Sequence, residues 1–92
     1  MSGPDEMRVR LNTLSPQRVE IHDDSALHAG HAGARSGGGH FRLTIVSDAF
    51  TGVRTVARHR MVYEALGDMM KTRIHALAIQ AMTAAEAEQQ PK

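Results

Sequence analysis

The sequence contains no cysteine and no tryptophan, and its 92 residues include only one tyrosine and two phenylalanines. Without cysteine the chain can form neither a disulfide nor a thiolate-based zinc site, and it has no thiol nucleophile for covalent catalysis. No run of about 18 apolar residues occurs, so the sequence predicts no membrane-spanning helix. The first ten residues also lack the apolar stretch of a signal peptide, so we expect a soluble, cytoplasmic protein.

Charge of one sign is not in excess either. Eleven Lys and Arg stand against ten Asp and Glu, which gives a net charge of +1 with neutral histidines. A protein whose main task is to bind nucleic-acid phosphates is usually more basic than this. Three arginines do lie close together, at Arg54, Arg58 and Arg60. They could form a basic helix face that contacts DNA, although the pattern favours a solvated amphipathic helix.

Histidine is the residue type that stands out, with six in 92 residues. A chain of this length holds one domain with one small core. It carries no phosphate-binding loop with its lysine, and no serine in an evident pairing with histidine and aspartate. We therefore predict a protein that is not an enzyme, in which histidines carry the chemistry.

Hydrophobic spacing in the first half of the chain predicts a helix and two strands. The helix covers residues 7–14, and the strands cover 18–22 and 40–46, where apolar and polar residues alternate. The Gly- and His-rich segment 26–39 cannot bury much apolar surface and therefore predicts a loop. Long loops inside small domains are more often functional than accidental. The two strands should pair antiparallel across this loop.

The second half of the chain predicts a helical region and a third strand. Apolar residues recur every three or four positions over 53–71, interrupted by Gly67, where a kink or a split into two helices is expected. The segment 75–82 fits either a helix or a strand by its pattern. Its length and its place after a helix favour a strand, parallel to the second one.

Together these elements predict an α+β fold with the order α-β-β-α-(α)-β. A three-stranded mixed sheet would carry the helices on one face. Residues 1–6 and 85–92 are expected to be flexible tails, which leaves a single domain over residues 7–84.

Several short segments, read in order, closely resemble the BolA family. The resemblance covers about residues 8–86, and the ordered series is specific where each piece alone would be weak. The segments are DDS at 23–25, HF at 40–41, VSDAFTG at 46–52, RHRMVY at 58–63 and IHALAI at 74–79.

This resemblance implies a fold like the type II KH domain and partnership with a monothiol glutaredoxin. The two proteins would share a [2Fe–2S] cluster, together with glutathione, for iron–sulfur trafficking or for sensing of iron or redox state. The resemblance also implies an alternative, a DNA-binding transcriptional regulator of stress response and cell morphology. On its own the protein would be a monomer or a weak dimer.

The resemblance assigns the cluster ligands to histidines. His75, at the head of the last strand, is the first ligand, and His28 or His31 from the loop is the second, with His28 favoured by its distance from the DDS turn. Cluster iron is usually held by cysteine thiolates, so a partner must supply them. A mononuclear zinc or copper site on the same three histidines is a further alternative. His40, at the start of the second strand, points outward by alternation and could border the site, although a structural role is favoured.

Overall fold

A computed structural model describes residues 2–25 and 39–89 of the chain. The order of its elements confirms the predicted one, and the described part of the chain has a short additional helix at its end. The elements are α1 (Gly3–Leu11), η1 (Asn12–Leu14), β1 (Arg18–Asp23), β2 (Gly39–Val46), η4 (Asp48–Phe50), α2 (Thr55–Leu66), α3 (Met69–Thr72), β3 (Ile74–Met82) and α4 (Ala84–Gln89).

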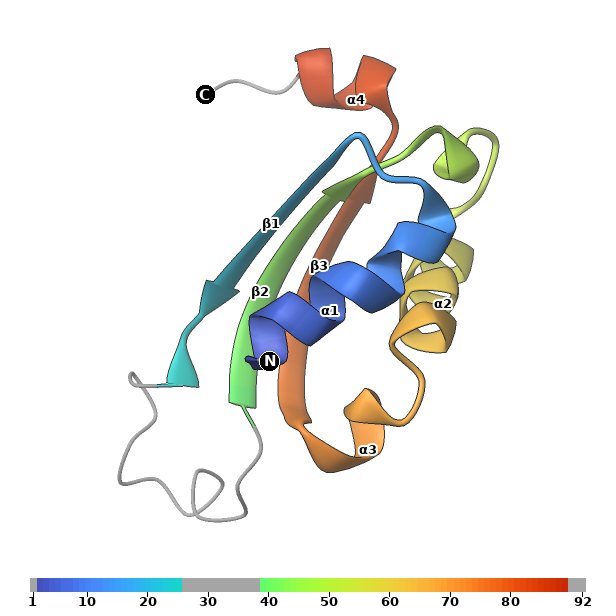
Figure 1. Ribbon diagram of the computed structural model, residues 1–92. Coiled ribbons are helices and arrows are strands. Elements are labelled where there is room, and N and C mark those ends of the chain that lie inside the picture. The colour runs from blue at the N-terminus through green and yellow to red at the C-terminus, as the bar shows by residue number, and fades with distance from the viewer. Residues whose placement is uncertain (1, 26–38, 90–92) are drawn as a thin grey trace.

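The three strands form one mixed sheet in the order β1-β2-β3. β1 and β2 pair antiparallel, with Val19 opposite Ile45, and β2 and β3 pair parallel, with Phe41 opposite Leu77. The parallel pair is connected through α2 and α3, which pack with α1 on one side of the sheet (Figure 1). The predicted α+β fold with a three-stranded mixed sheet is therefore confirmed.

The predicted split of the long helical region occurs at Gly67. This residue has a φ of +57°, a backbone conformation that favours glycine because a Cβ would clash there. Its N–H donates to the Tyr63 carbonyl at 2.9 Å, which closes the last turn of α2. The chain then starts α3 in a new direction, toward the beginning of β3.

Residues 3–6 and 85–89, which lie in the two predicted tails, belong to α1 and α4. At the first end, the Ser2 hydroxyl accepts a hydrogen bond from the Asp5 N–H at 3.2 Å and caps α1. At the other end, Thr83 and Glu86 form a capping box. The Thr83 N–H donates to the Glu86 carboxylate at 2.9 Å, and the Glu86 N–H donates to the Thr83 hydroxyl at 3.2 Å.

The core lies between the helices and the inner face of the sheet. Alternation in β2 sends every second side chain into it, and α1, α2 and α3 each contribute the apolar residues of one face. The buried set is Met7, Leu11, Phe41, Leu43, Ile45, Phe50, Val62, Leu66, Met69 and Ile74.

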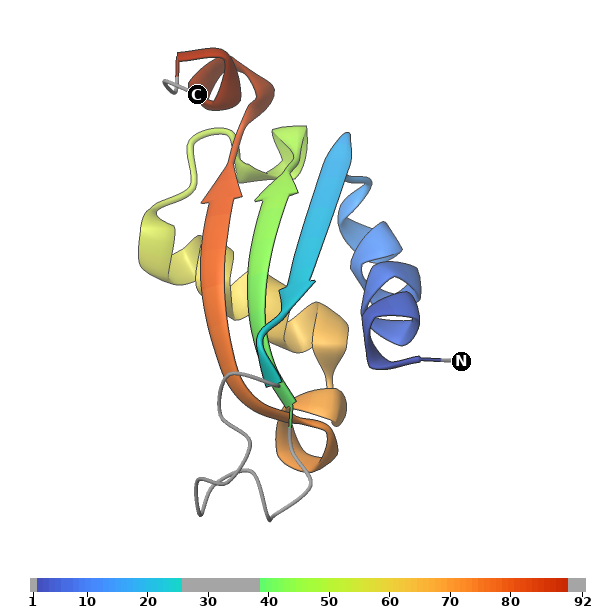
Figure 2. The same ribbon diagram turned by 90° about the vertical axis from the view of Figure 1, so that its left-hand side faces the viewer.

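The opposite face of the sheet is not covered by any described helix (Figure 2). It presents the other half of the alternating pattern, with charged and polar side chains on β1 and β2 and with Ala76, Ala78 and Gln80 on β3. None of the described helices has the length and apolarity needed to cross a membrane.

Candidate functional site

The start of β3 carries the first predicted ligand, His75, at a break in the strand pairing. Gly39 of β2 lies opposite Ile74, whereas the next residue, His40, lies opposite Ala76. The shift leaves His75 as an extra residue on β3, which is the arrangement of a β-bulge. Bulges redirect side chains from the regular alternation of a strand, and His75 is exposed.

The bulge brings a second histidine next to His75. The ring centroids of His40 and His75 are 5.1 Å apart, with the rings tilted by 44°. The backbone of His40 is fixed by the end of β1. Its N–H donates to the Ser25 hydroxyl at 3.1 Å, and its carbonyl accepts from the Asp24 N–H at 2.7 Å. The two rings therefore meet where the ends of all three strands come together.

Two histidines at this separation fit the geometry of one tetrahedral metal ion. Metal–nitrogen bonds of about 2.1 Å place the ring centres of two ligating imidazoles about 5 Å apart, close to the observed 5.1 Å. Within residues 2–25 and 39–89, His, Cys, Asp and Glu form no group of three or more that could hold a metal ion. The pair can supply two ligands, and a four-coordinate ion needs the others from outside these ranges.

The other two predicted ligands, His28 and His31, lie outside the described residues. The described ends of their segment both adjoin the histidine pair. Ser25 accepts the hydrogen bond from the His40 N–H, and Gly39 donates its N–H to the Arg73 carbonyl at 2.8 Å. The segment that carries His28 and His31 therefore begins and ends at the same end of the sheet as His75.

A network of ion pairs fixes the turn that leads into β3. Glu6 of α1 pairs with Arg10 at 2.8 Å and with Arg73, and Arg10 also pairs with Asp68 at 2.6 Å. The hydrogen bond from Arg10 lowers the pKa of Asp68. Burial raises the pKa of Glu6, but hydrogen bonds from Arg73 and Arg10 outweigh it, so this pKa is also lowered. The network ties α1 to a point two residues before His75.

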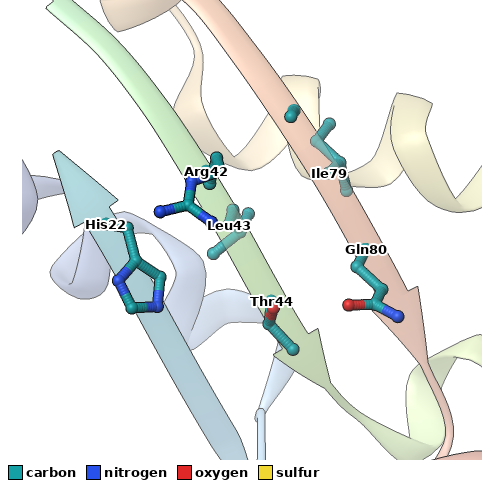
Figure 3. Close-up of a pocket in the computed structure, with 7 residues that line it drawn as sticks. His22, Arg42, Leu43, Thr44, Ile79 and Gln80 are labelled. Atoms are coloured by element: carbon teal, nitrogen blue, oxygen red, sulfur yellow. The ribbon is translucent and has the colours of Figure 1, made fainter. Parts of the chain in front are cut away.

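The open face of the sheet is hollowed beside the histidine pair. Arg42 lies between two hollows, and its Nε donates to the Asp24 carboxylate at 2.6 Å, which raises the pKa of Arg42 and balances its charge. Side chains from all three strands project around the second hollow (Figure 3). The first hollow is lined by Asp24, His40, Phe41, Arg42, Ala76, Leu77 and Ala78, and the second by His22, Arg42, Leu43, Thr44, Ala78, Ile79 and Gln80.

Arg58, the middle residue of the predicted basic helix face, is buried and therefore not part of that surface. Its Nε donates to the Val53 carbonyl at 2.7 Å, its Nη1 donates to the Ala81 carbonyl at 3.1 Å, and both Nη atoms donate to the Glu86 carboxylate at 2.6 and 3.2 Å. The guanidinium carbon also lies 5.8 Å from the ring centroid of Phe50. Because the donors of Arg58 are used inside the fold, the structure gives no support to a contact between Arg58 and nucleic acid, and that contact stays a prediction.

The other two arginines of that set, Arg54 and Arg60, are exposed on α2. Arg54 is the N-cap residue of the helix. With Arg58 withdrawn, the accessible positive charge on this helix is smaller than the sequence predicts.

His40 was expected to have a structural role or at most to border the site, whereas its ring lies directly beside that of His75. Alternation along β2 correctly sends its side chain to the open face, but the bulge at His75 leaves no pattern in the sequence. Only the parallel register of β2 and β3 brings the two rings together.

Comparisons with known proteins agree with the fold. The family model described as BolA-like protein matches residues 11–86. The chain is 46% identical over 92 residues to SufE-like protein 1, chloroplastic/mitochondrial, of Arabidopsis thaliana, with 91% of this chain and 25% of that protein covered. It is 42% identical over 75 residues to the DNA-binding transcriptional regulator BolA of Escherichia coli K12, with 82% of this chain and 69% of that protein covered. The chain thus spans a quarter of the plant protein.

A solved structure of BolA1 from Arabidopsis thaliana superposes with a TM-score of 0.80 at 38% identity, covering 99% of this chain and 98% of that one. The family model, the relatives and the solved structure agree over nearly the whole length of the chain. The BolA proteins among them are named as a regulator or as BolA-like proteins, and these names do not describe enzymes. The chain belongs to the BolA family.

Proposed function

We propose that this protein is a non-enzymatic partner of a monothiol glutaredoxin and supplies histidine ligands to a [2Fe–2S] cluster that the two proteins share with glutathione. His75 is the first ligand. The second is His28, His31 or, on the geometry above, His40. The observation that carries the proposal is the His40–His75 ring pair at the bulge, with centroids 5.1 Å apart.

The chemistry of the chain supports a shared site. Cluster iron is usually held by four cysteine thiolates, and histidines replace two of them on one iron in Rieske-type centres, which raises the reduction potential. This chain has six histidines and no cysteine. It can therefore contribute the histidine half of such a ligand set, while a glutaredoxin cysteine and the thiol of glutathione contribute the other half.

The role of this chain's residues is to position two imidazoles beside each other, of which His75 is exposed and His40 partly buried. The bulge presents His75, and the hydrogen bonds of His40, to the Ser25 hydroxyl and from the Asp24 N–H, fix its backbone. The ion pairs of Glu6 with Arg10 and Arg73 fix the turn before β3. Ligands that are positioned before binding lose less conformational freedom when the partner arrives.

The test is anaerobic cluster reconstitution with a monothiol glutaredoxin and glutathione, followed by co-purification, visible absorption and circular dichroism. We expect a heterocomplex whose spectrum differs from that of the glutaredoxin alone and disappears with His75→Ala. Parallel variants at His28, His31 and His40 identify the second ligand. His22→Ala is the matched control, because His22 lies on the same open face but on β1, away from the ring pair.

Two outcomes contradict the proposal. One is a purified protein that stably carries a cluster without any partner. The other is the absence of a complex and of any spectral change under these conditions.

A DNA-binding function is the second candidate, because the E. coli relative is named a DNA-binding transcriptional regulator. Arg54 and Arg60 are the exposed arginines of α2 that would contact phosphates. The expected signature is binding that weakens steeply with salt and is reduced in an Arg54→Gln/Arg60→Gln variant. An electrophoretic titration without a shift at low salt would remove this candidate.

A further inference from the structure

β3 forms one edge of the sheet (Figure 2). The hydrogen bonds at its end indicate which of its residues face outward. The Met82 carbonyl accepts from the N–H of Ser47, which follows β2, so Met82 faces the sheet. The preceding carbonyl, of Ala81, accepts from Arg58 instead and therefore faces the free edge. Successive residues of a strand direct their backbone groups to opposite sides.

By this alternation the N–H and carbonyl groups of Leu77 and Ile79 face outward with those of Ala81. The backbone groups of Ala76, Ala78 and Gln80 face β2. Within the described part of the chain, the free edge therefore offers two residues whose N–H and carbonyl groups both face away from the sheet, and it ends where Arg58 occupies the Ala81 carbonyl.

The two edges of the sheet differ in how they are protected. On the β1 edge, Arg18 and Glu20 form an ion pair, and Arg8 of α1 donates to the Val19 carbonyl at 2.8 Å. β3 runs from Ile74 to Met82 without a Lys, Arg, Asp, Glu, Pro or Gly. Proteins commonly place charges, prolines or bulges on an edge strand to prevent pairing with other chains. Over the stretch 76–80, β3 has none of these.

The side chains of this stretch are suited to a close neighbour. Ala76 and Ala78 on the open face are small and exposed, and they line the hollows beside Arg42. On the inner face, Leu77 and Ile79 pack on the core and remain only half-buried. A strand added along β3 would cover the half-buried Leu77 and Ile79 on one face and lie beside the small side chains of Ala76 and Ala78 on the other.

We propose that this edge is a self-association surface, on which a second copy of the chain pairs its β3 antiparallel to the first. A two-fold axis at Ala78 places Leu77 opposite Ile79 of the second copy, so the outward-facing residues form the hydrogen-bonded pairs. It also places Ala76 opposite Gln80 of the second copy, a small side chain against a longer one. The result is a continuous six-stranded sheet.

A second copy fits this edge because the edge is complementary to itself. Two-fold pairing requires the same patch to match its own reverse. Apolar residues meet on the inner face, and no charged residue of either strand faces another. A strand from a different protein would satisfy the same backbone groups, but nothing in the edge selects its side chains.

The contact is short, because Arg58 ends it at Ala81 and the bulge interrupts the strand at His75. Two hydrogen-bonding residues on each strand make a small contact, whereas stable complexes usually bury roughly 1,200 Å² or more. The expected dimer is therefore weak and forms at high protein concentration. This inference is independent of the proposed function.

The test combines sedimentation velocity over a concentration series with amide hydrogen exchange by NMR. We expect the sedimentation coefficient to rise with concentration, and the amides of Leu77 and Ile79 to become protected in parallel. The amides of Ala78 and Gln80, which bond to β2, should be protected at every concentration.

Ala78→Lys should abolish association, because two like charges would meet at the two-fold axis. Thr44→Lys is the matched control, since it adds the same charge to the same face on the central strand. Circular dichroism and thermal unfolding confirm that both variants fold, and the control should still associate.

A protein that remains monomeric at all concentrations, with Leu77 and Ile79 unprotected, overturns the proposal. A dimer that persists in Ala78→Lys also overturns it, since a different surface is then used. Protection of these two amides only after addition of another protein would assign the edge to a foreign strand instead.

Discussion

The two ends of β3 are built from polar residues that are used in opposite ways. At the end of the strand, Arg58, Glu86 and Thr83 satisfy one another, and little of the Arg58 guanidinium is left for a ligand. At the start, His75 stands exposed on a bulge beside His40. A motif shared with a family, here the triplet at 58–60, can therefore serve the fold, whereas the two histidine rings at the other end lie beside each other with His75 exposed and His40 partly buried.

The largest expected effect is on stability and comes from Arg58→Met. The substitution removes hydrogen bonds to the Val53 and Ala81 carbonyls and leaves both short of a donor, which we expect to lower the free energy of unfolding by about 3 kcal/mol. Urea denaturation followed by circular dichroism measures it. His75→Ala is the control from the other end of β3 and should stay within about 0.5 kcal/mol, as surface substitutions do.

An equal decrease in the free energy of unfolding in Arg58→Met and His75→Ala would mean that the two ends of β3 do not differ in their contribution to stability. A large loss in His75→Ala alone would mean that the bulge depends on the imidazole ring. Loss of the glutaredoxin complex in that variant would then no longer indicate ligation.

Gly39→Ala tests how tightly the histidine end is packed. A Cβ at this position would lie 2.4 Å from Cε2 and 2.6 Å from Cζ of Phe41, whose ring is buried in the core. Either the ring or the start of β2 must shift, and we expect a loss of about 2 kcal/mol, as for other overpacked cores. Gly3→Ala is the matched control, because its Cβ would touch the same ring at an ordinary 3.7 Å. Urea denaturation measures the unfolding free energy of both variants, and equal values for Gly39→Ala and Gly3→Ala would contradict the tight packing of Gly39 against Phe41.

The fold could be predicted from the sequence to the extent that local pattern determines it. The predicted strands 18–22 and 40–46 lie within β1 and β2, because one face of each is buried and the alternation is regular. Gly67 divides the helical region as expected. The helical ends were missed because their caps, Ser2 and the Thr83–Glu86 box, are single residues without a following apolar repeat.

The site was less predictable because it depends on contacts between distant residues. The sequence places Arg58 in an amphipathic helix, which suggests exposure, but its burial requires Glu86, 28 residues later in the chain. His40 and His75 come together only through the parallel register and its bulge. His28 and His31 lie outside the described residues, so their predicted role stays a prediction.

The smallest expected effect is the pH dependence of the Arg58–Glu86 pair. Hydrogen bonds from Arg58 and from the Thr83 N–H lower the pKa of Glu86 from 4.5 to about 2. A carboxyl whose pKa is lower in the folded state stabilises the fold above its unfolded pKa, and this contribution is lost as the pH falls through the folded value. The carboxylate of Glu86 should therefore contribute fully above pH 4.5 and progressively less toward pH 2. Because about half of the Glu86 side chain is exposed, the effect should be smaller than that of Arg58→Met.

Urea denaturation of the wild type and of Glu86→Gln at a series of pH values measures this effect. Gln keeps the shape and a hydrogen-bond acceptor but does not titrate, so the difference in unfolding free energy should be constant above pH 4.5 and shrink as the pH is lowered. Glu88→Gln, which changes an exposed neighbour on α4, is the matched control and should leave the pH profile unchanged. A difference between wild type and Glu86→Gln that does not vary with pH would mean that the carboxylate charge is not what holds α4 to Arg58. The capping box alone would then account for that end of β3.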